Sequence, residues 1–188
     1  AAGVVRDNWT FRLAAWLSGR ERELQAGEYH FEQALSAIEV VDTIVSGKVH
    51  LRPITFVEGW TIVEMARTFQ DAAFGTAEAF LSAARRVELI EELDPTATDL
   101  EGYLFPETYS LPRGATADDL VEVMVAEFRQ AFSVNLREEA ERRRMTVRAV
   151  VTLASLIQKE TGSLEEHQLV SAVYNNRLRI GMPLQCDP

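Results

Sequence analysis

The sequence predicts an α+β fold, in which a small α+β portion (residues 1–98) precedes a mainly helical portion (residues 99–188). Two observations predict this order. Short extended and helical patterns alternate along the first half of the chain, whereas the patterns after residue 116 are helical throughout. The polar, proline-containing stretch 94–99 (DPTATD) separates the two portions and marks the expected domain boundary.

The first portion is expected to alternate short helices with short extended segments. Caps and apolar residues at helical spacing predict helices at 6–17, between Ser36 and Gly47, at 62–69 and at 77–86. Extended patterns are expected at 24–31 and 49–57. Thr61 and Glu64 have the spacing of a capping box, which sets the start of the third helix.

The second portion is expected to consist of helices that begin after Thr116, at 136, after Thr146 and after Ser163. Ser163 and Glu166 again have the spacing of a capping box. The last helix is expected to turn one face inward, formed by Leu169, Ala172, Val173 and Asn176. A polar amide on such a face is either a satisfied core group or a group that faces a substrate.

Glu160 lies at the end of the expected helix 147–160. It follows Ile157 by three residues and Leu156 by four, so it continues the apolar face of this helix. The opposite, solvated face carries Arg148, Thr152, Ser155 and Lys159. A carboxyl group that points into a core or cleft loses solvation, which favours the protonated form that a general acid needs. The alternative is a last-turn glutamate that reaches water past the helix end, and the pattern leaves both open.

Composition excludes several classes of function. The 188 residues include 19 basic and 29 acidic side chains, a net charge of −10, which argues against a nucleic-acid binder because such proteins need a basic surface. The single cysteine, Cys186, excludes an internal disulfide framework and a multi-cysteine zinc site. Three scattered histidines exclude a histidine-rich metal centre, so no metal is expected. No apolar run approaches the roughly 20 residues of a membrane helix.

Three segments carry a resemblance to a known family: LEGYLFPETY at 100–109, LASLIQKET at 153–161 and VYNNRLRIGMPLQCDP at 173–188. In this order they form a first, second and third box, and together they resemble the conserved boxes of the YceG-like endolytic murein transglycosylases of the MltG type. The upstream segments LQAGEYHF (24–31) and ITFVEGWTIVEMA (54–66) are similar to the N-terminal portion of that family, which contains a LysM-like module. The resemblance therefore spans nearly the whole chain.

The resemblance implies a lytic transglycosylase that cleaves the β-1,4 bond between N-acetylmuramic acid and N-acetylglucosamine in nascent peptidoglycan and so terminates glycan strand elongation. The essential glutamate of the family maps onto Glu160. It would protonate the glycosidic oxygen and then accept the proton of the muramyl C6 hydroxyl as a 1,6-anhydro ring closes. One glutamate can suffice, where a classical glycosidase needs two carboxylates, and no metal or organic cofactor is implied. Many members carry a second glutamate where this chain has Gln158, which cannot act as an acid.

The resemblance also points to residues that would bind the substrate: Tyr103, Glu107, Tyr109, Asn176 and Gln185. Tyr103 and Tyr109 belong to an aromatic series in the first box whose alternate rings could line a sugar groove, and core packing is the alternative for them. Asn176 and Gln185 could hydrogen-bond acetamido groups or orient Glu160. The catalytic portion at 99–188 is expected to be incomplete, because the family continues past Asp-Pro with further helical and strand segments.

The expected setting is the cell membrane. The resemblance implies a single-pass anchor before Ala1, a catalytic domain on the periplasmic or extracellular side, glycan strands as substrate and cell-wall synthases as partners. A non-catalytic peptidoglycan-binding module is the main alternative, and a scaffold of the division or elongation machinery is another. An aminodeoxychorismate lyase would need pyridoxal phosphate on a lysine, and the chain has only Lys48 and Lys159. Lys159 falls on the solvated face, which argues against that reading.

Overall fold

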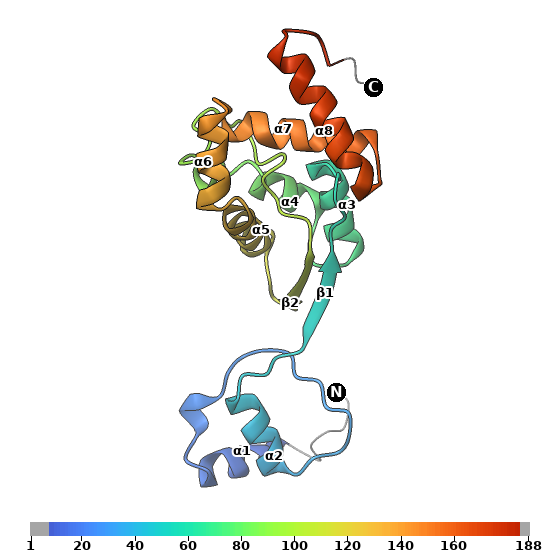
Figure 1. The fold of residues 1–188 in the computed structure, drawn as a ribbon. Helices are drawn as coiled ribbons and strands as arrows, with labels where there is room; N and C mark the ends of the chain where they lie inside the picture. Colours follow the sequence, from blue (N-terminus) through green and yellow to red (C-terminus); the bar gives the residue numbers. More distant parts are fainter. Residues whose placement is uncertain (1–7, 185–188) are drawn as a thin grey trace. The chain divides into compact units, whose positions relative to one another are not determined.

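The computed structural model describes residues 8–184. Over this range the chain forms eight α-helices and one two-stranded antiparallel sheet, which confirms the predicted α+β class (Figure 1). The residues cluster into two compact units, the first within Ala1–Ile54 and Tyr109–Ala115 and the second within Thr55–Thr108 and Thr116–Pro188. The predicted domain boundary near residue 98 stays a prediction.

The first unit contains two helices, α1 (Asn8–Leu17) and α2 (Ala37–Val45), and a short 3₁₀ helix, η1 (Glu21–Glu23). Ala14 and Ala15 of α1 pack on Val41 of α2 to form its small core. Strand β1 (Leu51–Thr55) pairs with β2 (Thr108–Pro112). The expected strand at 24–31 is wrong, because this segment is irregular. Instead of a ladder, the Tyr29 hydroxyl donates to the carbonyl oxygens of Gln25 and Ile44.

The second unit is built almost entirely of helices. They are α3 (Ile62–Asp71), α4 (Ala77–Ala83), the 3₁₀ helix η2 (Val87–Leu89), α5 (Ala117–Ala131), α6 (Val134–Arg142), α7 (Val147–Glu160) and α8 (Leu164–Arg179). These bounds agree closely with the expected helices. No helix among residues 8–184 combines the length and the apolar character that a membrane crossing requires.

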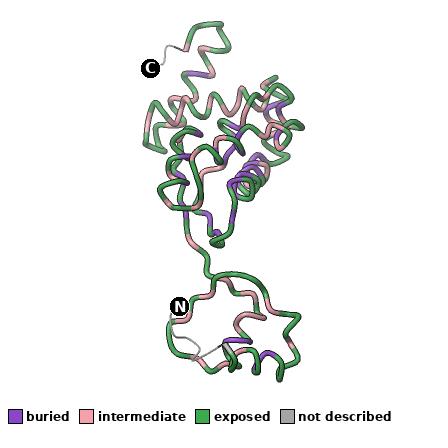
Figure 2. Tube along the Cα trace, turned by 180° about the vertical axis from the view of Figure 1, so that it is seen from behind, coloured by how far each residue is buried: buried purple, intermediate pink, exposed green. Residues whose placement is uncertain are grey.

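The core of the second unit contains an aromatic cluster around Phe80. The Phe80 ring lies 5.5 Å from that of Phe69 and 6.1 Å from that of Phe56, measured between centroids. Buried positions also run along α5, as Figure 2 shows, and include Leu120, Val121, Met124, Val125 and Phe128. By contrast, α7 has no buried residue and α8 has only Tyr174. The helices that carry the second and third boxes therefore lie at the surface of the unit.

Side-chain caps set the start of most helices, as the sequence predicts. The Thr61–Glu64 capping box at α3 is present, and the hydroxyl of Thr146 accepts a hydrogen bond from the N–H of Ala149 at the start of α7. The predicted Ser163–Glu166 box is wrong, because Ser163 makes no side-chain cap. The Glu166 carboxylate instead accepts a hydrogen bond from the hydroxyl of Thr161 at 2.6 Å.

Removal of the cap of α7 is expected to weaken the fold measurably. Thr146→Ala leaves the N–H of Ala149 without its side-chain acceptor and should lower the free energy of unfolding by roughly 1 kcal/mol. Ser133→Ala at the start of α6 is the matched control, since Ser133 makes no side-chain cap. Urea unfolding of both variants measures the difference, and equal stability of the two would contradict a stabilising role of the Thr146 cap.

Candidate active site

Asp94 is a buried carboxylate that joins three segments of the second unit. Its Oδ2 accepts hydrogen bonds from the Tyr103 hydroxyl (2.6 Å) and from Nε of Arg148 (2.7 Å). Its Oδ1 accepts from the hydroxyl (2.9 Å) and the backbone N–H (3.2 Å) of Thr96. Because Tyr103 lies in the first box and Arg148 in the first turn of α7, Asp94 ties this helix to the box. Arg148 is exposed, as expected for the solvated face of α7, and its Nε also binds this buried carboxylate.

The protonation states in this cluster follow from burial and hydrogen bonding. Burial raises the pKa of Asp94, but the hydrogen bonds from Tyr103, Arg148 and Thr96 outweigh it and lower that pKa to about 2. Burial, followed by the hydrogen bond to Asp94, raises the pKa of the Tyr103 hydroxyl well above its usual range. Asp94 is thus ionised at neutral pH, and Tyr103 keeps its proton.

Glu160 is the last residue of α7, and its side chain is exposed. The expectation that it continues a buried stripe is wrong, because the apolar face of α7 is only half covered, for example at Leu153 and Ile157. The Tyr174 hydroxyl of α8 donates a hydrogen bond to Oε2 of Glu160 at 3.0 Å. This carboxyl group is therefore accessible to a ligand, and one of its two oxygens has a fixed partner within the protein.

The last turn of α7 also lies against the segment that leads into α3. Nε2 of Gln158 donates to Glu58 at 3.4 Å, and a Cβ placed on Gly59 would lie 3.6 Å from the Gln158 side chain. The ammonium group of Lys159 interacts electrostatically with Glu64 in the first turn of α3. A glutamate at position 158 would face Glu58 as a like charge, so the amide found here suits this contact.

The first box approaches α7 closer to the start of the helix. A Cβ on Gly102 would lie 2.7 Å from Cγ1 of Val151, and φ here is +82°, so only glycine fits this position without strain. Val151 precedes Glu160 by nine residues, which is roughly 13 Å along a helix. Glu101 of the same box accepts a hydrogen bond from the N–H of Ile62, at the start of α3 (3.0 Å). We expect Glu160 to lie within reach of the 100–109 box as well, and this stays a prediction.

The predicted substrate-binding residues of the first box lie in different surroundings. Tyr103 is 3% exposed, and its ring packs edge-on against Phe128, so the structure gives it a place in the core. Glu107 is exposed, and its backbone oxygen accepts from the N–H of Phe56 (3.0 Å). Tyr109 is buried in β2 and belongs to the first unit. Contact of these three side chains with a substrate stays a prediction.

Of the two substrate-binding residues predicted in the third box, the structure describes Asn176. Asn176 is exposed, and its Oδ1 accepts from Arg179 at 2.8 Å. The expected inner face of α8 is wrong, because Leu169 and Val173 are exposed and the face with Tyr174 is turned inward instead. Gln185 lies outside the described residues, so its substrate-binding role stays a prediction.

Two members of this region, Asp94 and Tyr174, are not among the site residues that the sequence predicts. Asp94 begins the polar stretch that predicts a domain boundary, and nothing in its local pattern indicates burial. Tyr174 lies in the third box and three and four residues after Ser171 and Val170, both of which are half-buried. A helical face drawn through these residues contains Tyr174, but the face with Leu169 and Val173 is more apolar, so periodicity favours that face.

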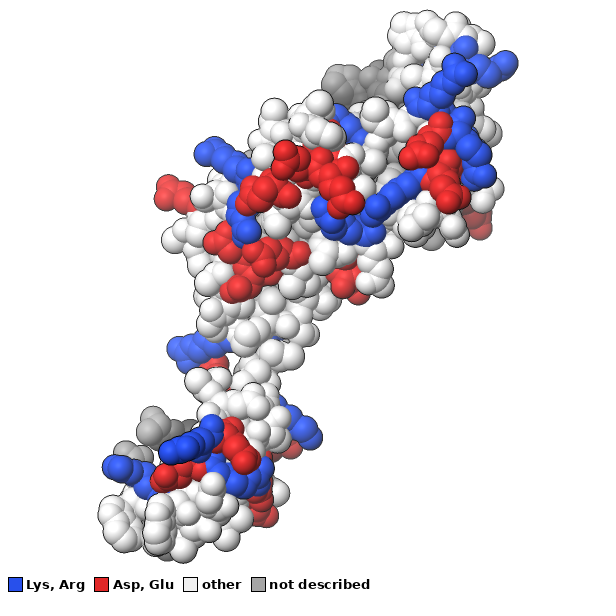
Figure 3. Space-filling model, turned by 90° about the vertical axis from the view of Figure 1, so that its left-hand side faces the viewer, with Lys and Arg blue, Asp and Glu red and all other residues white. Residues whose placement is uncertain are grey.

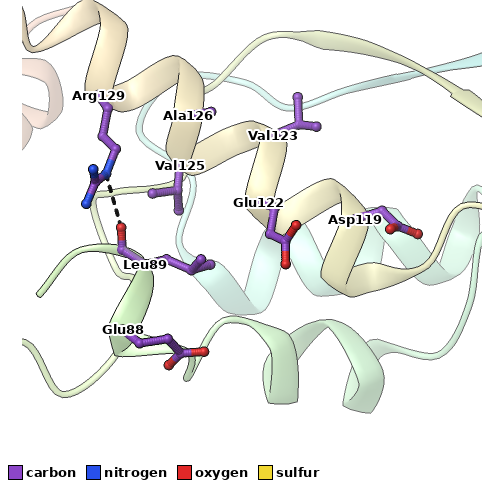
Figure 4. A pocket seen from close by; sticks show the side chains of 8 residues that line it. All are labelled: Glu88, Leu89, Asp119, Glu122, Val123, Val125, Ala126 and Arg129. Atoms are coloured by element: carbon purple, nitrogen blue, oxygen red, sulfur yellow. Dashed lines mark hydrogen bonds between the residues drawn. The ribbon is translucent and has the colours of Figure 1, made fainter.

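A separate hollow lies between α5 and η2 (Figure 4). It is lined by Glu88, Leu89, Asp119, Glu122, Val123, Val125, Ala126 and Arg129. Nε of Arg129 donates to the carbonyl oxygen of Leu89 across it, and Arg86 pairs with Glu88 (3.0 Å) and Glu122 (2.8 Å). On the side of the molecule drawn in Figure 3, acidic and basic side chains lie interleaved on the surface. Glu88 and Glu122 are paired with Arg86, and Asp119 accepts hydrogen bonds from Thr116, so the carboxylates of the hollow already have partners. Glu160 is not among the lining residues, and we place the candidate site at Glu160.

Comparison with known proteins supports the resemblance of the three boxes. Two relatives are named endolytic murein transglycosylase. The relative from Streptococcus pneumoniae is 29% identical over 99% of this chain and 38% of its own length. The relative from Bacillus subtilis is 26% identical over 87% of this chain and 50% of its own length. The chain thus spans half or less of the length of these curated relatives.

A solved structure shows the same fold. The crystal structure of a YceG-like protein from Listeria monocytogenes superposes with a TM-score of 0.64 at 22% identity, over 94% of this chain and 64% of that one. The model of the YceG-like family matches residues 1–188, which is the whole chain. The chain therefore belongs to the YceG-like family.

Proposed function

We propose that this chain is part of an endolytic murein transglycosylase, which cuts peptidoglycan glycan strands at internal bonds. The observation that carries the proposal is the exposed carboxyl group of Glu160, at the end of a surface helix and held by one hydroxyl, in a chain of the YceG-like family. The names of the relatives in Streptococcus pneumoniae and Bacillus subtilis support the same activity.

The proposed chemistry needs one group that gives and then regains a proton. Glu160 donates its proton to the oxygen between N-acetylmuramic acid and N-acetylglucosamine while the bond to the anomeric carbon breaks. The carboxylate so formed accepts the proton of the muramyl C6 hydroxyl as that oxygen attacks the anomeric carbon. A 1,6-anhydro ring results, no water is consumed, and the enzyme is left in its starting state.

The wider setting is part of the same proposal. The first portion would act as a LysM-like module that holds N-acetylglucosamine-containing strands, and a single-pass anchor before Ala1 would keep the catalytic portion at the outer side of the cell membrane. Cell-wall synthases would be its partners, since cleavage of a nascent strand ends its elongation. The resemblance at 24–31 and 54–66 supports the LysM-like assignment.

Analysis of the cleavage products tests this function. The protein is incubated with uncrosslinked glycan strands of defined length, and the fragments are separated by size and weighed by mass spectrometry. Endolytic cleavage gives fragments of intermediate length from the start of the reaction, each new muramic end lighter by one water than a reducing end. Reducing ends would indicate a hydrolase, and binding without cleavage would indicate a non-catalytic peptidoglycan-binding module. Either outcome contradicts the proposal.

A further inference from the structure

We infer that Tyr174 is a positioning residue for Glu160: it holds Oε2 of the carboxyl group, so that Oε1 is the oxygen that transfers the proton. The inference rests on the proposed function. Its basis is the hydrogen bond of 3.0 Å that the Tyr174 hydroxyl donates to Oε2. The two residues lie on consecutive helices, so the bond joins the end of α7 to the middle of α8.

The two partners differ in their freedom to move. Tyr174 is 5% exposed and is the single buried residue within α8, so its surroundings restrict the ring. Glu160 is exposed and ends its helix, so its flexible side chain would otherwise sample several rotamers in water. A fixed donor thus restrains a mobile acceptor, which is the arrangement that positioning requires.

The turn between the helices keeps this donor in place. The Thr161 hydroxyl donates to Glu166 at 2.6 Å, and the Thr161 hydroxyl oxygen accepts from the N–H of Ser163 at 3.1 Å. Nε2 of His167 lies 3.0 Å from the carbonyl oxygen of Thr161. Because Thr161 directly follows Glu160, these bonds tie the first turn of α8 to the end of α7 and set which residue of α8 meets the carboxyl group.

One hydrogen bond can serve both protonation states of Glu160. When the proton is on Oε1, Oε2 is a carbonyl-type oxygen and accepts from Tyr174; after the proton has left, Oε2 belongs to a carboxylate and accepts again. The proton on Oε1 passes to the glycosidic oxygen, and the C6 hydroxyl proton returns to Oε1. Tyr174 keeps its own proton throughout, so the charge and the atoms balance without a second acid.

The test is Tyr174→Phe, which removes the hydroxyl and keeps the ring. We expect kcat to fall on the order of 10-fold, as for loss of a hydrogen bond to a charged group, with KM within about twofold of the wild-type value. The midpoint temperature of thermal unfolding should change little, because the exposed carboxyl group of Glu160 can bind water instead of the Tyr174 hydroxyl. Asn175→Ala is the control: it removes bonds to Ser171 within α8 (2.8 and 3.2 Å) and should leave both constants unchanged.

The outcomes separate this inference from the proposed function. Anhydro ends from the wild-type protein together with a wild-type kcat for Tyr174→Phe would refute the positioning role alone. A loss of activity that follows a loss of folded protein, or an equal loss in Asn175→Ala, would show that Tyr174 only stabilises the helix pair. Absence of anhydro ends from the wild-type protein would refute the proposed function and this inference with it.

Discussion

Asp94→Ala is expected to lower the free energy of unfolding by on the order of 3 kcal/mol, the scale found when a buried hydrogen-bonded carboxylate is removed. The substitution leaves the buried Tyr103 hydroxyl without its acceptor and releases Arg148 from the segment around residue 94. The half-exposed guanidinium can bind water, so most of the cost comes from the buried hydroxyl and from the loosened contact of α7. Urea unfolding at neutral pH measures the change.

The pH dependence of this effect follows from the lowered pKa of Asp94. The group has a pKa of about 2 in the folded protein against an ordinary value of 3.8, so ionised Asp94 stabilises the fold fully above about pH 4. That stabilisation is lost as the pH falls from about 4 through 2, where both states are protonated. The difference between the wild-type protein and Asp94→Ala should therefore shrink over this range.

A matched control distinguishes the cluster from a general effect of removing an acidic charge. Asp71→Ala removes an exposed carboxylate at the end of α3 and should change stability little. An Asp94→Ala protein that unfolds at the same urea concentration as Asp71→Ala would contradict the structural role of Asp94. A stability difference that stays constant down to pH 2 would contradict the assigned pKa.

Local signals in the sequence predict most of the helices of this fold. The features that the sequence does not predict depend on contacts between residues far apart in the chain. The capping residues Thr61 and Thr146 mark helix starts because their bonds reach only three residues along the chain. The buried cluster of Asp94 depends on Tyr103, nine residues away, and on Arg148, fifty-four residues away. Neither partner is visible in the local pattern, so the segment around Asp94 has the composition of a polar linker although the Asp94 side chain is buried.

The two surface helices show a second limit of sequence reasoning. Periodicity finds α7 and α8, but it assigns the inner face to the more apolar side. In the structure that side of α8 is exposed at Leu169 and Val173, and Glu160 is exposed as well. Since amphipathicity does not say which neighbours cover a helix, the bond between Glu160 and Tyr174 was not predictable from the pattern.

Glu160→Gln is expected to reduce cleavage of glycan strands by about 100-fold or more, the range for loss of a general acid. The amide keeps the size of the side chain and can still accept the hydrogen bond from Tyr174 through its oxygen, but it cannot donate a proton to the glycosidic oxygen. Because Glu160 is exposed, the substitution should leave the stability of the fold close to that of the wild type. Strand binding should therefore persist while turnover is lost.

Glu107→Gln is the matched comparison for this prediction. Glu107 is an exposed carboxylate in the first box, and its expected role is substrate binding rather than proton transfer. Its substitution should raise KM more than it lowers kcat, because a binding contact acts on the substrate and the transition state alike.

The rate at which 1,6-anhydro-muramic ends form, measured for the wild-type protein, Glu160→Gln and Glu107→Gln on the same uncrosslinked strands, tests the central claim most directly. Assignment of Glu160 as the proton donor predicts that the Glu160→Gln rate falls by about two orders of magnitude while Glu107→Gln retains most of the wild-type kcat. Full activity of Glu160→Gln together with an inactive Glu107→Gln would contradict this assignment and move the acid to Glu107.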